Sequence, residues 1–189
     1  MRTYNCLSKH EFAINDYKIS PITDSNILSI LKWRNEQMHI LRQNEVLTEE
    51  KQVSYFEKYI WPTMKESKPN QVLFGLYYKS DFIGYGGLVH ISWIDKRGEV
   101  SFLVNTERLN NEAVYQSDMS NYLRLIKEVA FNILNFNRLF TETYDVRPLH
   151  ISILEKSGFI LEGRMKQHVL IDNKYIDSLI HGCLRENNI

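Results

Sequence analysis

The sequence has few cysteines, and the two that it has lie far apart. Cys6 and Cys183 are near opposite ends of the 189 residues, which is neither a disulfide framework nor a metal-ligand spacing. We therefore expect a reducing compartment, the cytoplasm, and no bound metal. The chain also lacks an apolar run of membrane-spanning length, and residues 1–5 lack the apolar segment of a signal peptide. These absences predict that no membrane partner is involved.

An excess of either charge is absent as well. Lys and Arg together number 23, and so do Asp and Glu, whereas a nucleic-acid-binding protein usually shows a basic excess or stripe. We therefore expect no nucleic-acid partner, although a local cationic cluster for a phosphorylated small molecule remains compatible with the balance. Internal repeats and low-complexity segments are also missing. With 43% hydrophobic and 12% aromatic residues, the composition is that of one ordered globular domain.

Hydrophobic periodicity predicts a single α/β (α+β) domain over residues 17–189, after a leader or edge strand at residues 1–16. Helices are expected after Asp24 or Ser25, after Thr48 and after Ser117 or Asp118, and a further one should begin at Pro148 and end just before Gly158. Strands are expected at residues 17–22, 72–78, 82–93, 99–104, 138–143, 159–171 and 175–184. This order predicts a mixed, mostly antiparallel central sheet with helices on both faces.

Glycines interrupt the strand at residues 82–93. The run Gly84-Tyr85-Gly86-Gly87 opens no helix, so it fits no phosphate-binding fingerprint. It predicts a bulge or a close approach of two backbones instead.

Three stretches carry a family likeness. They are Leu31-Lys32-Trp33-Arg34-Asn35 with Thr48 to Gln52, then Gly98 to Asn105, and then Ile153-Leu154-Glu155-Lys156-Ser157-Gly158-Phe159 continuing to Arg164. Together they resemble the GNAT superfamily of acetyl-CoA-dependent N-acetyltransferases, over residues 17–184. The third stretch is the most specific. The first is similar to enzymes that acetylate nucleotide-linked amino sugars and to ribosomal-protein N-terminal acetyltransferases.

The resemblance implies direct transfer of an acetyl group from acetyl-CoA to a small-molecule amine, with a nucleotide-linked amino sugar as the leading acceptor. N-terminal acetylation of a protein is the enzymatic alternative. A GNAT-like domain that binds acyl-CoA without catalysis is the third. Association with a second copy, as a homodimer, also stays open.

The same resemblance implies the cofactor contacts. Leu103, Val104 and Asn105 end the strand that would hold the thioester, and Arg108, Asn110, Asn111 and Ala113 occupy the pyrophosphate loop. Arg147 and Lys156 fall on the later helix that contacts coenzyme A. The family's loop glycine is replaced by Asn111, a residue that tolerates positive φ, so a nest of backbone amides is expected there.

The resemblance also implies catalytic candidates. Glu99 matches a catalytic Glu of several family members and shares a strand face with Ser101, which would hold a relay water. The alternative is a Glu that faces solvent or pairs with Arg97. The family's acid, a Tyr, is replaced by Leu154, so Tyr144 and Tyr175 become candidates among 11 tyrosines, and His90 is the most favourable histidine.

The acceptor is expected near the end of the first helix. Trp33 or Trp93 would stack on a base or sugar, and Arg34, with Asn35 beside it, would contact phosphate. The alternative is a core tryptophan with a solvent-facing arginine.

Overall fold

A computed structural model describes residues 2–188, in which eight strands form one sheet of order β1-β2-β3-β4-β5-β6-β8-β7. All neighbours are antiparallel except β5 and β6, which are parallel. The bounds are β1 Phe12–Ile14, β2 Tyr17–Pro21, β3 Val72–Tyr78, β4 Asp81–Ser92, β5 Arg97–Val104, β6 Arg138–Tyr144, β7 Ile160–Ile171 and β8 Lys174–Leu184. The predicted mixed, mostly antiparallel sheet is therefore confirmed.

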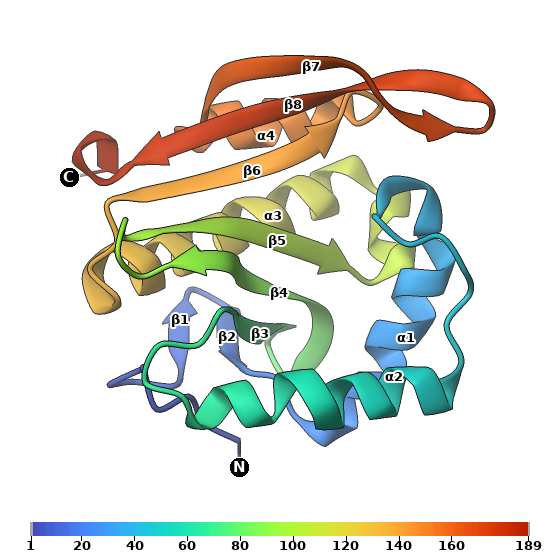
Figure 1. Cartoon of the computed structure of the whole chain (residues 1–189). Coiled ribbons are helices and arrows are strands. Elements are labelled where there is room, and N and C mark those ends of the chain that lie inside the picture. Colours follow the sequence, from blue (N-terminus) through green and yellow to red (C-terminus); the bar gives the residue numbers. More distant parts are fainter. Residues whose placement is uncertain (1, 189) are drawn as a thin grey trace.

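Helices cover both faces of the sheet, α1 and α2 on one and α3 and α4 on the other (Figure 1). Their bounds are α1 Ile27–Glu36, α2 Glu49–Tyr55, α3 Glu112–Lys127 and α4 Pro148–Lys156. Wider turns extend α2 over Phe56–Ile60 and α3 over Glu128–Ile133, and short helical turns lie at Asp24–Asn26, Met38–Ile40, Pro62–Lys65, Thr106–Asn110 and Arg185–Asn188. In the described chain, no helix is long and apolar enough to cross a membrane.

Local chemistry explains where the helices begin. Thr48 accepts a hydrogen bond from the Lys51 amide at 3.3 Å, which confirms it as the N-cap of α2. The predicted start of α3 at Ser117 is wrong, because Asn111 caps the helix earlier by accepting from the Val114 amide at 3.1 Å. The expected start lies too late because the resemblance assigns residues 108–113 to the pyrophosphate loop, although the helix begins at Glu112.

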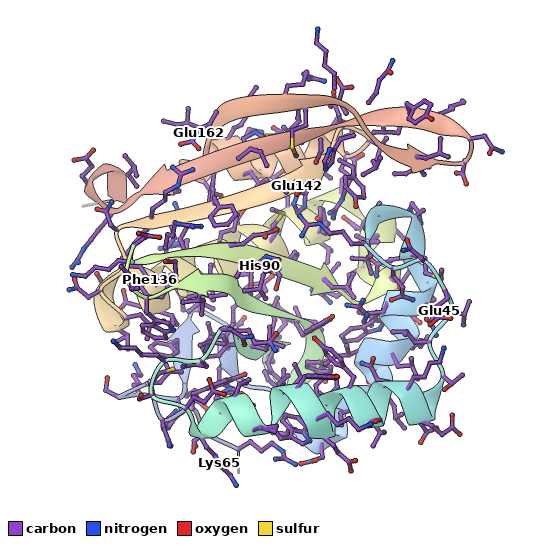
Figure 2. All side chains as sticks on the ribbon, in the orientation of Figure 1. Glu45, Lys65, His90, Phe136, Glu142 and Glu162 are labelled. Carbon is purple, nitrogen blue, oxygen red and sulfur yellow. The ribbon has the colours of Figure 1, made fainter. Side chains whose placement is uncertain are left out.

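The core lies against both faces of the sheet. Strand residues such as Ile19, Phe74 and Leu88 are fully buried, as is Tyr122 of α3 (Figure 2 shows all side chains). Tyr4 is buried too, and β1 pairs with β2 at the edge of the sheet, so the segment before residue 17 packs onto the domain.

The glycines of β4 are sites of close backbone approach, as predicted. A Cβ on Gly86 would lie 2.1 Å from the Ser101 carbonyl oxygen, and one on Gly87 would lie 2.0 Å from that of Val72. Both distances are impossible for real atoms, so only glycine lets β3, β4 and β5 lie this close.

Candidate active site

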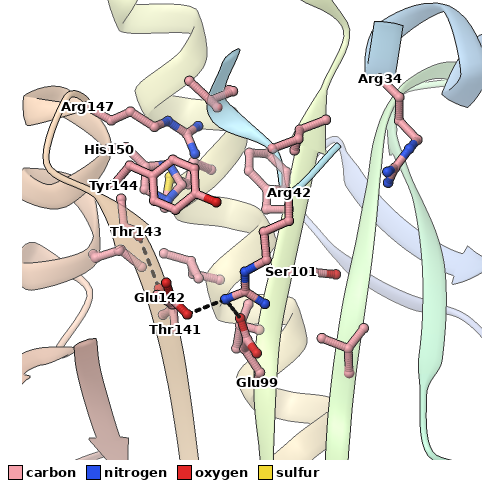
Figure 3. A pocket seen from close by; sticks show the side chains of 18 residues that line it. Arg34, Arg42, Glu99, Ser101, Thr141, Glu142, Thr143, Tyr144, Arg147 and His150 are labelled. Atoms are coloured by element: carbon pink, nitrogen blue, oxygen red, sulfur yellow. Dashed lines mark hydrogen bonds and ion pairs between the residues drawn. The ribbon is translucent and has the colours of Figure 1, made fainter. Parts of the chain in front are cut away.

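The two parallel strands separate part-way along their length. β5 and β6 share three register pairs that end at Glu99–Phe140, although β5 continues to Val104 and β6 to Tyr144. Beyond Glu99, no described strand pairs with the β6-facing edge of β5, so its backbone groups face an opening. We call this opening the donor cleft, a cavity of about 250 Å³ lined by Glu99, Ser101, Glu142 and Tyr144, among others (Figure 3).

A second cavity lies on the α1–α2 face of the sheet. We call it the α2 chamber, a space of about 470 Å³ between α2, with Lys51, Gln52 and Tyr55, and the strands β4 and β5. Arg34, Leu41, Val89, Ser101 and Phe102 line both cavities. The donor cleft and the α2 chamber therefore meet at the middle of β5, where Ser101 lies.

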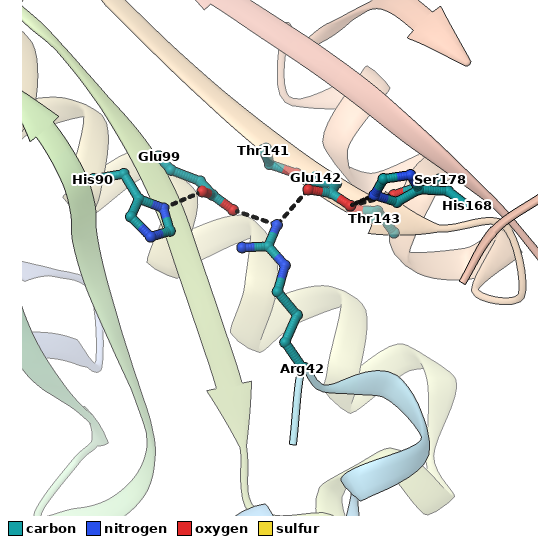
Figure 4. Close-up of polar contacts among 8 residues, drawn as sticks. All are labelled: Arg42, His90, Glu99, Thr141, Glu142, Thr143, His168 and Ser178. Atoms are coloured by element: carbon teal, nitrogen blue, oxygen red, sulfur yellow. Dashed lines mark hydrogen bonds and ion pairs between the residues drawn. The ribbon is translucent and has the colours of Figure 1, made fainter. Parts of the chain in front are cut away.

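A chain of polar contacts crosses the donor cleft (Figure 4). The Arg42 guanidinium lies 3.3 Å from Glu99 Oε1 on β5 and 2.5 Å from Glu142 Oε2 on β6. Ser178 of β8 donates to Glu142 Oε1 at 2.7 Å. The carboxylate side chains are only 11% and 15% exposed, whereas that of Arg42 is 50% exposed. Burial disfavours the Arg42 cation, but Glu99 and Glu142 outweigh it and raise the pKa of Arg42.

His90 continues this chain toward solvent. Its Nδ1 lies 2.6 Å from Glu99 Oε2, and its side chain is 66% exposed. The pairing of β4 with β5 is irregular between Val89 and Ser92, and His90 has a left-handed φ of 47°. Because residues on a regular strand alternate between faces, this bulge re-aims His90 toward the carboxylate of Glu99. The alternative reading of Glu99, with Arg97 or solvent as its partner, is wrong.

Tyr144 and a second cluster line the far wall of the donor cleft. Partial burial raises the pKa of the Tyr144 phenol. On α4 and α3, Arg147 donates to the Tyr115 hydroxyl at 3.0 Å, and that hydroxyl lies 2.6 Å from His150 Nδ1. Burial, reinforced by the charge of Arg147, holds the pKa of His150 well below its usual value. The buried imidazole is therefore neutral, and its Nδ1 accepts a hydrogen bond from the Tyr115 hydroxyl.

The predicted pyrophosphate loop is built differently from the expectation. Arg108 forms a bidentate pair with Asp118, a fully buried carboxylate, at 2.5 and 2.8 Å. Its guanidinium is thus occupied within the fold. Asn111 has a φ of −128°, so the expected positive-φ nest is wrong at this residue, and its side chain caps α3.

The other predicted cofactor residues are dispersed around this end of β5. Leu103 lines the α2 chamber, and the Val104 carbonyl accepts from Gln37 Nε2 at 2.8 Å. Asn105 caps the following helical turn, while Asn110 and Ala113 are exposed beside the start of α3. Lys156 lies elsewhere, in a groove between α3 and α4 that Arg124 also lines. Of the predicted cofactor residues, Arg147 lines the donor cleft.

Two of the predicted acceptor residues belong to the packed core. Trp33 is 4% exposed, and its ring packs on Phe82 at 5.0 Å between centroids. Trp93 packs edge-on against Phe136 and donates to the Pro69 carbonyl at 2.7 Å. These packing contacts contradict the expected stacking role of both tryptophans.

Asn35 holds a loop in place, whereas Arg34 faces the two cavities. The amide of Asn35 bonds both the N–H and the C=O of Leu47 at 2.9 Å, which holds the loop between α1 and α2. Arg34 reaches into both cavities and donates to Gln43 Oε1 and to the Tyr85 hydroxyl, each at 3.1 Å.

A family model described as the acetyltransferase (GNAT) domain matches residues 19–180. The chain belongs to the GNAT acetyltransferase family. As a member of this family it is an acetyl-CoA-dependent N-acetyltransferase. A search of the curated proteins gave no match. The expected GNAT resemblance is thereby confirmed at the level of the family.

Solved structures agree on the fold. The spermidine N-acetyltransferase of Vibrio cholerae, in a crystal structure with CoA and spermine, has a TM-score of 0.78 at 16% identity, over 91% of this chain and 97% of that one. A dodecameric structure of spermidine N-acetyltransferase from Vibrio cholerae has a TM-score of 0.74 at 16% identity, over 92% and 96%. At this identity the likeness establishes the GNAT fold and leaves the acceptor to be argued from the site.

Sequence reasoning missed several cleft residues. Arg42 and Glu142 complete the polar chain, and Tyr115 with His150 forms the buried cluster. The sequence does carry a signal for Glu142. It is the one charged residue in the second half of its strand, and a carboxylate on a buried strand needs a polar partner. Arg42 lies in an irregular loop, and no periodicity places such a residue. Among the described residues, no group of three or more His, Cys, Asp or Glu side chains is arranged to hold a metal.

Proposed function

We propose that this GNAT enzyme transfers the acetyl group directly to a primary amine that enters from the α2 chamber, with a nucleotide-linked amino sugar as the leading acceptor. The observation that carries the proposal is the meeting of the donor cleft and the α2 chamber at Ser101, beside the Glu99 carboxylate. Acetyl-CoA in the first and an amine in the second would place thioester and nucleophile side by side, which supplies much of the catalytic gain.

The donor cleft suits an extended acyl carrier. The β6-facing edge of β5 beyond Glu99, where Val100 and Phe102 line the cleft, offers backbone groups to the amides and the thioester carbonyl of acetyl-CoA. Arg147 would approach the phosphates from the start of α4. Lys156 and Arg124, in the groove between α3 and α4, form a second cationic patch suited to a phosphate of the nucleotide end.

Proton transfer is assigned to the polar chain. The acceptor ammonium would lose a proton to Glu99, directly or through a water on Ser101, and His90 would pass that proton to solvent. The free amine then attacks the thioester carbonyl, its nitrogen loses a second proton along the same chain to solvent, and the C–S bond breaks to release the thiolate. Tyr144, whose phenol lines the donor cleft, would donate its proton to the departing thiolate, and solvent would restore it.

The α2 chamber favours a small acceptor over a protein terminus. It combines Arg34 with aromatic side chains at Tyr55, Phe56, Tyr85 and Phe102. That combination suits a flat base and a phosphate. A wide groove with an acidic rim would have favoured peptide acetylation.

Acetyl-CoA binding is the first test. A ligand at a hundred times its Kd stabilises the native state by about 2.7 kcal/mol, so a clear rise in Tm is expected at millimolar acetyl-CoA. Unchanged Tm together with no heat of binding in calorimetry would contradict the proposal. Binding without thiol release, over a screen of nucleotide amino sugars, peptides and polyamines, would show a non-catalytic acyl-CoA-binding domain.

Glu99→Gln tests the base. The substitution keeps the size and one acceptor oxygen but removes the proton acceptor, so we expect turnover to fall by roughly 10²–10⁴-fold. Acetyl-CoA affinity should hardly change. Glu57→Gln, at an exposed residue after α2, is the matched control. Wild-type turnover of the Glu99 variant would remove this residue from the mechanism.

A further inference from the structure

The α2 chamber has an uneven charge. Its lining contains two cations, Arg34 and Lys51, and no Asp or Glu side chain within the described part of the chain. At the rim, Lys51 pairs with Glu45 at 2.8 Å, and both side chains are more than half exposed. Arg34 is therefore the cation of the chamber interior.

Arg34 has only neutral hydrogen-bond partners. Its Nε and one terminal nitrogen donate to the Gln43 amide oxygen and the Tyr85 hydroxyl. The other arginine that enters the site, Arg42, contacts two carboxylates. A partly buried guanidinium without a carboxylate partner keeps most of its capacity to bind an anion, because charge-assisted bonds are about twice as strong as neutral ones.

Gln52 supplies an independent observation. Its side chain is 3% exposed and lines the α2 chamber, yet its Nε2 has no hydrogen-bond partner among the described residues. A buried amide donor without a partner is costly, by about 1–3 kcal/mol, and needs an explanation. A ligand oxygen in the chamber would satisfy it.

We propose that the acceptor amine carries an anionic group, a carboxylate or a phosphate, and that Arg34 and Gln52 bind this group in the α2 chamber. The inference rests on the proposed acetyl transfer and narrows its substrate class. The ammonium end of such an acceptor would lie toward Glu99, and the anionic end would lie toward α1 and α2. A polyamine, whose other charges are all positive, would meet Arg34 without a compensating carboxylate in the lining of the chamber.

Matched acceptors test the charge preference. Thiol release is measured with acetyl-CoA and with glucosamine 6-phosphate against glucosamine, 4-aminobutanoate against 4-aminobutanamide, and spermidine. We expect kcat/KM to favour the anionic member of at least one pair by about 10- to 100-fold, the range typical of hydrogen bonds to a charged group. The size of the preference in the phosphate pair, compared with that in the carboxylate pair, shows which of the two anions the enzyme binds. Calorimetry of the same compounds with CoA-loaded enzyme measures the preference independently of turnover.

Variants test the two residues. Arg34→Gln should abolish the preference by raising KM for the anionic acceptor by about 10- to 100-fold, and KM for the neutral analogue and for acetyl-CoA should rise less. Lys32→Gln removes an exposed cation of the same helix and is the control. Gln52→Leu should weaken binding of the anionic acceptor without lowering Tm, because the amide Nε2 has no partner in the protein to lose.

Two outcomes would overturn the inference. One is a neutral analogue or spermidine bound and acetylated as well as every anionic acceptor. The other is a charge preference that survives Arg34→Gln and Gln52→Leu. In either case acetyl-CoA binding and thiol release with some amine would leave the proposed acetyl transfer intact. Conversely, selective binding of an anionic amine without turnover would support the inference and contradict the proposed function.

Discussion

Replacing Arg42 by methionine would leave the two carboxylates of the donor cleft without their shared cation. One guanidinium nitrogen lies 3.3 Å from Glu99 and 2.5 Å from Glu142, so the carboxylates are close neighbours. Two like charges about 6 Å apart repel by about 3 kcal/mol at an effective dielectric constant near 20, which corresponds to about two pH units. Because Arg42 is half exposed, screening reduces the expected effect to about one unit.

The direction of the expected pH shift depends on the protonation state of Glu99 that catalysis needs. A general base must be unprotonated, and repulsion between two carboxylates favours protonation of one of them. The acid limb of kcat/KM should therefore move to higher pH by about one unit in Arg42→Met, so that activity at pH 6 falls more than activity at pH 8. The assay is thiol release with acetyl-CoA over pH 5–9. Arg42→Lys keeps the charge, so its acid limb should stay close to that of the wild type.

A double variant makes the reasoning refutable. Adding Glu142→Gln to Arg42→Met removes one of the two repelling charges, so the acid limb should return toward that of the wild type. An acid limb that stays in place in Arg42→Met would show that this cation does not control the base. A shift that Glu142→Gln leaves unchanged would show that the coupling does not pass through the second carboxylate.

Three further substitutions separate structural roles from functional ones. Arg108→Met leaves Asp118 buried without its cation, so urea unfolding should show a loss of about 3–5 kcal/mol, with acetyl-CoA affinity nearly unchanged; the reverse pattern would return Arg108 to the pyrophosphate site. Because burial lowers the folded-state pKa of His150, the unfolded chain binds the proton first, and wild-type stability should fall below about pH 6.5 by up to about 1.4 kcal/mol per unit. His150→Gln should flatten that decline, and an unchanged slope would contradict a buried neutral imidazole. Trp33→Ala should cost about 3–5 kcal/mol of stability without changing the acceptor KM, whereas a large rise in KM would place Trp33 at the acceptor.

The order of strands and helices was predictable because it rests on local periodicity. Only a short gap separates the expected strands at residues 159–171 and 175–184, and in it Asp172 and Asn173 have the positive φ, 48° and 61°, that a tight hairpin requires. The face of β5 that carries Glu99 and Ser101 followed from strict alternation. An apolar residue alone does not identify the buried face: Leu28 of α1 is 51% exposed, and the helix buries Ile30 and Trp33 instead.

The candidate site was predictable only where one element carries it. Glu99 and Ser101 share a strand, and the structure places both on the donor cleft. His90 reaches Glu99 because of a bulge in β4, and Arg42 reaches it from an irregular loop. Neither a bulge nor a loop produces a hydrophobic periodicity that a sequence analysis could detect. The loop residue Arg108 was misread for a related reason, since its partner Asp118 lies within the next helix and looked like the residue that caps it.

The charges on the two sides of Ser101 together select an orientation for the acceptor. In the donor cleft, Glu99, Glu142 and Arg42 carry a net charge of one negative unit, leaving His90 aside. An ammonium group neutralises that charge, and once its proton has passed to Glu99 the cluster is neutral without it. In the α2 chamber, Arg34 lacks a carboxylate partner and attracts the opposite end of the molecule. An amine with an anionic group is thus bound with its ammonium end toward the thioester. When the ammonium loses its proton to Glu99, the free nitrogen lies beside the thioester while the anionic group stays bound to Arg34.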